Sequence, residues 1–246
     1  MFPILQIGPL AVRTPGLLLI LGAYLGLSLT ERYAIRRGMK ADPLYNLFFL
    51  VAAAGLIGAR VSFAILNIDL FRSTPLNLLS LDPSLLDPWG GSIAGLIAAL
   101  VYGQRKKLAF WSTLDAYTPA FAVSAVALGL SHFASGKAFG VPTSLPWGIE
   151  LWGAHRHPSQ IYETLTAGLI LFVIWRRFNK TYPAGNLILQ FIAMSAGARL
   201  FLETFHGDSI LILKNIRLAQ IIAWVILAST LIVLEIKKGR SEKIAP

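Results

Sequence analysis

Seven apolar runs, separated by short polar segments, constrain the fold of this chain more than any other feature. Each run is long enough, or nearly so, to cross a bilayer as a helix. The runs are Pro15–Leu29, Tyr45–Leu66, Gly90–Tyr102, Phe110–Leu130, Ser159–Trp175, Asn186–Phe205 and Leu218–Glu235. A soluble domain of 246 residues could not bury a chain that is 55% hydrophobic and 14% charged. The sequence therefore predicts an all-α polytopic membrane bundle of about seven spans, forming one domain over residues 1–246.

The third run, Gly90–Tyr102, is short and rich in Gly and Ala, which predicts a helix that tilts, breaks or packs closely on its neighbours. The first run is not expected to be a cleavable signal peptide, because its positive cluster follows the apolar stretch. The chain has no Cys, which excludes disulfides, thiolate metal sites and a Cys nucleophile on the chain itself.

Lys and Arg predict the orientation. Of 22 such residues, fourteen lie in alternate loops and the C-terminal tail, six lie on the opposite side, and Arg60 and Arg199 fall inside predicted helices. Basic loops remain cytoplasmic, so we expect the N-terminus outside and the C-terminus in the cytoplasm. The two longest loops, 67–89 and 132–158, then face outward. The net charge of +10 is therefore a topology signal, and we expect no nucleic-acid partner.

The segment His157–Glu163 brings an imidazole, an amide, a phenol and a carboxylate to the start of the fifth run. Such groups are costly to place in a membrane and favour a functional role. His157 suits proton transfer near neutral pH, or it closes the mouth of the bundle by hydrogen bonding. Gln160, Tyr162 and Glu163 line a site, or they cap and anchor the helix. Ser159 lacks the context of a hydrolase nucleophile, and no His pair has the spacing of a zinc site.

Arg199 and Glu203 lie four residues apart in the sixth run and so share one helical face. They form either an ion pair that locks helix packing, or an anion site in which Arg199 holds a phosphate or carboxylate and Glu203 orients it. Arg60, deep in the second run, suggests a cationic pocket whose natural ligand is a lipid head group. Asp115 is expected to be a helix-end carboxylate near the inner surface.

Several motifs follow one another in an order that resembles a known family, the prolipoprotein diacylglyceryl transferases. The similarity covers nearly the whole chain. The matching segments are Val12–Gly16 with Arg36–Gly38, Gly58–Arg60 with Asn67, Asp115 with Pro119 and Ala120, Gly136–Gly148, His157–Glu163, and Gly197–Arg199 with Glu203.

The resemblance implies an enzyme of the bacterial cytoplasmic (inner) membrane that moves a diacylglyceryl group from phosphatidylglycerol to the lipobox cysteine of a prolipoprotein, with glycerol phosphate leaving. We expect no cofactor and no metal. Arg199, with Arg60, would stabilise the charge on the leaving phosphate, and Glu203 would hold it in place. His157, Gln160, Tyr162 and Glu163 would shape the outer gate, with His157 handling the proton.

Four polar positions of the family site differ in this chain. Pro15 replaces a tyrosine, Ile93 a histidine or tyrosine, Gly129 a lipid-binding arginine, and Lys137 an acid. His132 and Lys137 can bring positive charge to the same cavity. These departures leave open a second hypothesis, a lipid- or lipoprotein-binding relative without the chemistry. A small transporter would predict paired broken helices in two related halves, which the sequence does not contain.

Overall fold

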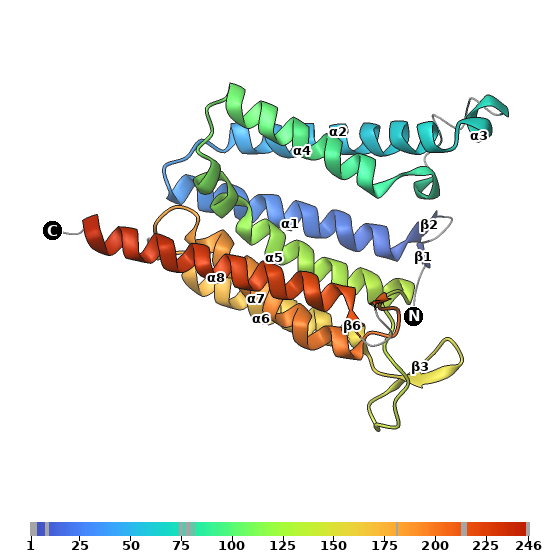
Figure 1. Ribbon diagram of the computed structural model, residues 1–246. Helices are drawn as coiled ribbons and strands as arrows, with labels where there is room; N and C mark the ends of the chain where they lie inside the picture. The colour runs from blue at the N-terminus through green and yellow to red at the C-terminus, as the bar shows by residue number, and fades with distance from the viewer. Residues whose placement is uncertain are drawn as a thin grey trace. The chain divides into compact units, whose positions relative to one another are not determined.

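The computed structural model describes residues 4–7, 10–73, 76, 80, 82–180, 182–212 and 216–244. Helices make up most of these residues (Figure 1). The helices are α1 (Thr14–Arg36), α2 (Asp42–Leu66), α3 (Ile68–Ser73), α4 (Pro88–Arg105), α5 (Phe110–Ser135), α6 (Ser159–Arg177), α7 (Asn186–Leu202) and α8 (Leu218–Ile244), with 3₁₀ turns η2 (Pro83–Leu85) and η3 (Glu203–Phe205). A helix occupies each of the seven predicted runs, so the prediction of a helical membrane protein is confirmed.

Among the described residues, five helical segments are long and apolar enough to cross a membrane. They are Thr14–Arg36, Asp42–Leu66, Phe110–Ser135, Asn186–Phe205 and Leu218–Gly239. α4 and α6 are helices of 18 and 19 residues that fall outside this set. The count of seven spans therefore stays a prediction.

The described residues also form three short antiparallel hairpins, one before α1 and two between helices, and the sequence analysis did not predict them. They pair β1 (Ile4–Ile7) with β2 (Leu10–Arg13), β3 (Ile149–Leu151) with β4 (Ala154–Arg156), and β5 (Leu211–Ile212) with β6 (Ile216–Arg217). The turn between β3 and β4 places both Trp152 and Gly153 at positive φ, 55° and 72°. A two-residue hairpin turn requires this backbone, and glycine adopts it readily whereas tryptophan does not.

The contacts of the chain divide it into two compact units, residues 1–33 with 114–246, and residues 34–113. In the second unit α2 packs on α4 through small residues. A Cβ on Gly58 would lie only 2.2 Å from Ala94 Cβ, and one on Gly91 would lie 2.8 Å from Gly55 O. The Gly- and Ala-rich third run thus forms a helix that packs closely, one of its expected outcomes.

In the first unit α1 crosses α5 equally closely, because a Cβ on Gly22 would lie 2.4 Å from Ala127 Cβ. α5 also fixes the start of α7. The carboxylate of Asp115, only 5% exposed, accepts hydrogen bonds from the backbone amides of Gly185 at 2.6 Å and Ile188 at 2.9 Å. Asp115 therefore caps α7 from a different helix.

The boundary of the predicted outer loop 132–158 was wrong. α5 continues beyond Leu130 to Ser135, because the polar residues that follow the apolar run are compatible with a helix. Gly136, with φ of 73°, then ends it. His132 consequently lies on a helix, where the last turns of α5 face α6. The other predicted loop, 67–89, likewise contains α3 and η2.

Candidate functional site

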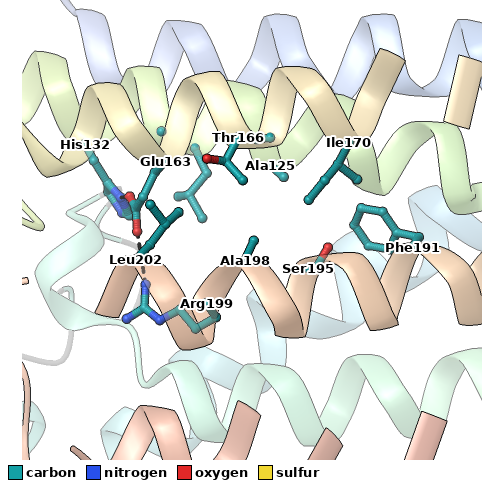
Figure 2. Close-up of a pocket in the computed structure, with 13 residues that line it drawn as sticks. Ala125, His132, Glu163, Thr166, Ile170, Phe191, Ser195, Ala198, Arg199 and Leu202 are labelled. Atoms are coloured by element: carbon teal, nitrogen blue, oxygen red, sulfur yellow. Dashed lines mark hydrogen bonds and ion pairs between the residues drawn. The ribbon is translucent and has the colours of Figure 1, made fainter. Parts of the chain in front are cut away.

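Helices α5, α6 and α7 line an open cavity of about 330 Å³ within the first unit (Figure 2). Most of its lining is apolar, and consists of Ala125, Leu128, Gly129, Ala167, Ile170, Phe191, Ala198 and Leu202. Figure 2 shows His132, Glu163 and Arg199 grouped toward one end of the cavity and Phe191 toward the other. The cavity is therefore amphipathic, with an apolar body and a charged end.

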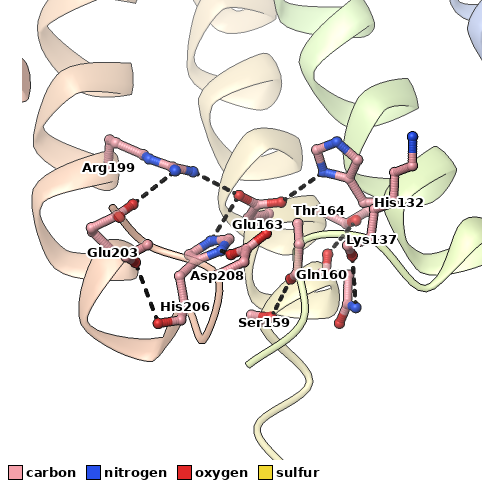
Figure 3. A network of polar contacts seen from close by, with 12 residues as sticks. His132, Lys137, Ser159, Gln160, Glu163, Thr164, Arg199, Glu203, His206 and Asp208 are labelled. Atoms are coloured by element: carbon pink, nitrogen blue, oxygen red, sulfur yellow. Dashed lines mark hydrogen bonds and ion pairs between the residues drawn. The ribbon is translucent and has the colours of Figure 1, made fainter. Parts of the chain in front are cut away.

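Glu163, on the second turn of α6, is the centre of the charged end (Figure 3). Its Oε1 lies 3.0 Å from Arg199 Nη1 and 3.0 Å from His206 Nε2. Its Oε2 lies 3.3 Å from Nδ1 of His132. The carboxylate thus joins side chains from α5, α6, α7 and the segment after η3.

Arg199 and Glu203 form the ion pair that their spacing predicted, with Arg199 Nη2 2.7 Å from Glu203 Oε2. The two side chains differ in exposure. Glu203 is 2% exposed, whereas Arg199 is 43% exposed and also holds Glu163. Arginine has five N–H donors, so two carboxylate contacts leave further donors for a ligand. Both readings of the pair are therefore compatible with its geometry.

The start of α6 is tied to the preceding loop. Pro158 precedes the helix, and the next two side chains bind backbone carbonyls: Ser159 Oγ donates to Ala138 O at 2.6 Å, and Gln160 Nε2 donates to Lys137 O at 2.9 Å. Both side chains are buried. In this structure Gln160 therefore contacts the loop, and it is not among the residues that line the cavity.

His157 and Tyr162 lie in a separate aromatic cluster. Nδ1 of His157 is 3.4 Å from the Tyr162 hydroxyl, which also accepts a hydrogen bond from Trp147 Nε1 at 2.9 Å. Both rings pack on Phe205, with centroids 5.1 Å and 5.5 Å away. The structure thus connects His157 to the loop before α6 and to η3, and the cavity is lined by other residues.

The remaining predicted positions lie in different surroundings. Gly129 lines the cavity and is where α5 approaches α6, because a Cβ there would lie 2.5 Å from Thr164 Oγ1. Lys137 is exposed. Arg60 belongs to the other compact unit, where Nη2 donates to the carbonyl of Ser80 and lies 3.4 Å from that of Asp82.

His206 is a site residue that sequence reasoning missed. Its ring is 2% exposed, and Nδ1 lies 3.3 Å from Asp208 Oδ1 while Nε2 faces Glu163. Burial of the ring lowers its pKa, but the contacts with Glu163 and Asp208 outweigh burial, so the pKa of His206 is raised. Arg217 fixes the segment, since Nη1 donates to His206 O at 2.6 Å.

A signal for His206 was present, because it follows Arg199 by seven residues and Glu203 by three. That spacing places the three side chains on one face of a continuing helix.

The charged end can bind an anion at Arg199, and its histidines can exchange a proton. Within the described ranges, no group of three His, Cys, Asp or Glu side chains is arranged to hold a metal ion. Because its body is apolar and one end carries Arg199, the cavity suits an amphipathic ligand with an apolar part and an anionic group.

Comparison with known proteins gives consistent matches over most of the chain. The family described as prolipoprotein diacylglyceryl transferase matches residues 3–236. A protein of Clostridioides difficile (strain 630) named phosphatidylglycerol–prolipoprotein diacylglyceryl transferase is 29% identical over 209 residues, covering 85% of this chain and 84% of that protein. A protein of the same name from Bacillus licheniformis is 26% identical over 254 residues, covering 97% and 93%.

Proposed function

Because this chain belongs to the prolipoprotein diacylglyceryl transferase family, we infer that it transfers a diacylglyceryl group from phosphatidylglycerol to prolipoproteins. The amphipathic cavity between α5, α6 and α7 is the observation that supports this inference within the structure. Its apolar body suits acyl chains, and its charged end suits a phosphate. The chemistry of the cavity thus matches both parts of a glycerophospholipid.

Arg199 is the phosphate-binding group in this proposal. Two carboxylates fix its guanidinium, while 43% of the side chain remains exposed. A guanidinium held in place stabilises charge that grows on a leaving phosphate without having to reorganise. Glu203 positions Arg199 from its buried side and completes the anion site.

The acceptor thiol comes from the substrate, because the chain contains no cysteine. We assign this thiol to the lipobox cysteine of the prolipoprotein signal peptide. The loop that Ser159 and Gln160 tie to α6, together with His157 and Tyr162, forms the gate through which the peptide approaches.

We also propose where the protein lies in the cell. The chain is a multi-pass protein of the bacterial cytoplasmic membrane, with about seven spans, its N-terminus outside and its C-terminus in the cytoplasm. The bias of Lys and Arg toward alternate loops supports this orientation. His157–Glu163 then lies at the outer face, where exported prolipoproteins arrive.

Transfer of labelled diacylglyceryl from phosphatidylglycerol to a lipobox peptide by the purified chain tests the proposal. Arg199→Ala should lower kcat/KM by about 100-fold or more, the usual effect of removing a group that stabilises transition-state charge. Arg199→Lys should recover only part of the loss, because an ammonium lacks the planar fork.

Arg176→Ala is the matched control, since Arg176 is an exposed arginine near the opposite end of α6 and should leave transfer unchanged. Full transfer by Arg199→Ala would exclude the role given to Arg199. No transfer by the intact chain, together with retained phosphatidylglycerol binding, would favour a lipid-binding relative that has lost the chemistry.

A further inference from the structure

The reaction requires a group that removes the proton from the acceptor thiol, because the thiolate is the nucleophile. The charged end of the cavity contains a pair suited to this task. His132 and Glu163 both line the cavity, and Nδ1 of His132 lies 3.3 Å from Oε2 of Glu163. The pair joins α5 to α6.

Glu163 presents its two oxygens to different partners. Arg199 and His206 both contact Oε1 at 3.0 Å, which fixes the carboxylate from the side of α7 and η3. Oε2 is left to His132. Because the carboxylate is fixed and 17% exposed, it is a rigid acceptor for a single imidazole N–H.

A carboxylate at Nδ1 determines the tautomer of the imidazole. It stabilises the proton on Nδ1 and leaves the lone pair on Nε2, the same logic by which an acid orients a catalytic histidine in other enzymes. The His132 side chain is 26% exposed and lines the cavity. Nε2 can therefore meet a substrate thiol.

The other three histidines of the chain do not combine a carboxylate at one ring nitrogen with a place in the lining of the cavity. His206 is 2% exposed, with a carboxylate at each ring nitrogen. His155 lies on the β3–β4 hairpin, where Nδ1 is 3.1 Å from Glu150 and Nε2 is 3.0 Å from Leu145 O. Nδ1 of His157 lies 3.4 Å from a phenol rather than a carboxylate, and the ring packs on Phe205.

We propose that His132 is the general base of this chain, with Glu163 as the residue that positions it; the assignment rests on the transferase function proposed above. Nε2 of His132 takes the proton of the lipobox thiol. The thiolate sulfur forms a bond to the carbon of the diacylglyceryl group that carries the phosphate, and the bond from that carbon to the phosphate oxygen breaks. His132 then returns the proton to the glycerol phosphate that leaves, so the imidazole is neutral again.

Two lipobox peptides, one with cysteine and one with selenocysteine, can show whether His132 acts as a base or has only a structural role. A selenol is already ionised at neutral pH and needs no base. His132→Asn keeps an N–H for Glu163 but has no basic nitrogen. We expect the variant to lose about 100-fold or more in kcat/KM with the cysteine peptide. With the selenocysteine peptide it should retain most of the activity of the intact chain.

Transfer to the selenocysteine peptide also shows that the variant is folded. Arg176→Ala, outside the cavity and the loop before α6, should change neither rate, whereas Arg199→Ala should slow both peptides alike. An equal loss with both peptides, or no loss with the cysteine peptide, would overturn the assignment of His132 while leaving the transferase function in place. An intact chain that transfers to neither peptide would overturn the transferase function itself, and the assignment with it.

Discussion

At the scale of single residues, the carboxylate of Glu163 determines the charge arrangement of the site. It is shared by Arg199, His206 and His132, which come from three other segments of the chain. Glu203 and Asp208 supply the remaining negative charge, at Arg199 and His206. Replacing any one member changes the partners of the others, so effects within this set should be non-additive.

His206 should make stability depend on pH. Its pKa is raised in the folded protein above the unfolded value of about 6.5. A raised folded pKa means that protonated His206 stabilises the fold fully below the unfolded pKa, and that this contribution is lost as pH rises through the folded pKa. Thermal unfolding in detergent should therefore show a melting temperature that falls as pH rises from the unfolded pKa of His206 through its folded pKa.

The groups that face His206 are Glu163, Asp208 and Arg199, of which the two acids raise its pKa and the arginine opposes them. His206→Asn should lower the melting temperature at acidic pH and flatten the profile. A variant whose profile parallels that of the parent chain would contradict the role given to His206.

Gly129 should tolerate no larger side chain. A Cβ there would lie 2.5 Å from Thr164 Oγ1 and 3.1 Å from the backbone N and Cα of Thr164, so shortening the threonine alone does not relieve the contact. Gly129→Ala should cost about 1–3 kcal/mol in the free energy of unfolding, as overpacking usually does.

Gly168→Ala on α6 is the control for this substitution, because a Cβ at Gly168 meets nothing within 4 Å. It should be neutral or stabilise the helix by up to about 1 kcal/mol. Denaturant titration of both variants in the same detergent measures the difference, and equal stabilities would disprove the steric account.

At the scale of elements, α7 depends on α5 for its N-terminal cap. Asp115→Ala would leave the buried amides of Gly185 and Ile188 without their acceptor. Hydrogen bonds to a charged group are each worth about 1.5–3 kcal/mol, so losing both should lower the free energy of unfolding by about 3–6 kcal/mol. Asp115→Asn keeps one acceptor oxygen, so its stability should lie between that of the parent chain and that of Asp115→Ala. Chemical unfolding measures the three stabilities. If Asp115→Asn were less stable than Asp115→Ala, the capping role of Asp115 would be contradicted.

The helices were predictable because a membrane-spanning run is a strong local signal. The end of α5 was not, since the polar residues after Leu130 carry no apolar periodicity although they remain helical as far as Ser135. The β3–β4 hairpin escaped prediction because its strands have three residues each and Trp152 stands where a turn residue is expected.

The site was predictable only where its contacts are local in sequence. The pair of Arg199 and Glu203 follows from a spacing of four on one helix. The contacts of Glu163 with His132 and Arg199 join different helices, and no local pattern specifies which helices are neighbours. His206 was missed for a related reason, because the apolar run ends at Phe205, just before it.

At the scale of the whole molecule, the cysteine-free sequence allows a direct test of orientation. Single cysteines at the exposed positions Gln104 and Ser144 leave the basic cluster Arg105–Lys107 intact. With an impermeant maleimide on intact cells, Ser144→Cys should react and Gln104→Cys should react only after the membrane is opened. The parent chain should not react at all. The opposite labelling pattern would reverse the proposed orientation, and labelling of both would refute the span count between them.

The close approach of α5 and α6 at Gly129 also affects which sequences this chain can reach by mutation. From the resemblance, the family's arginine is expected at that position, and the single substitution Gly129→Arg would introduce it here. The backbone of Thr164 would nevertheless meet its Cβ, so the two helices must first move apart through substitutions elsewhere. An arginine at position 129 thus depends on earlier substitutions that separate α5 from α6. With the present packing, the positive charge at this cavity has to come from other positions, such as Arg199 and His132.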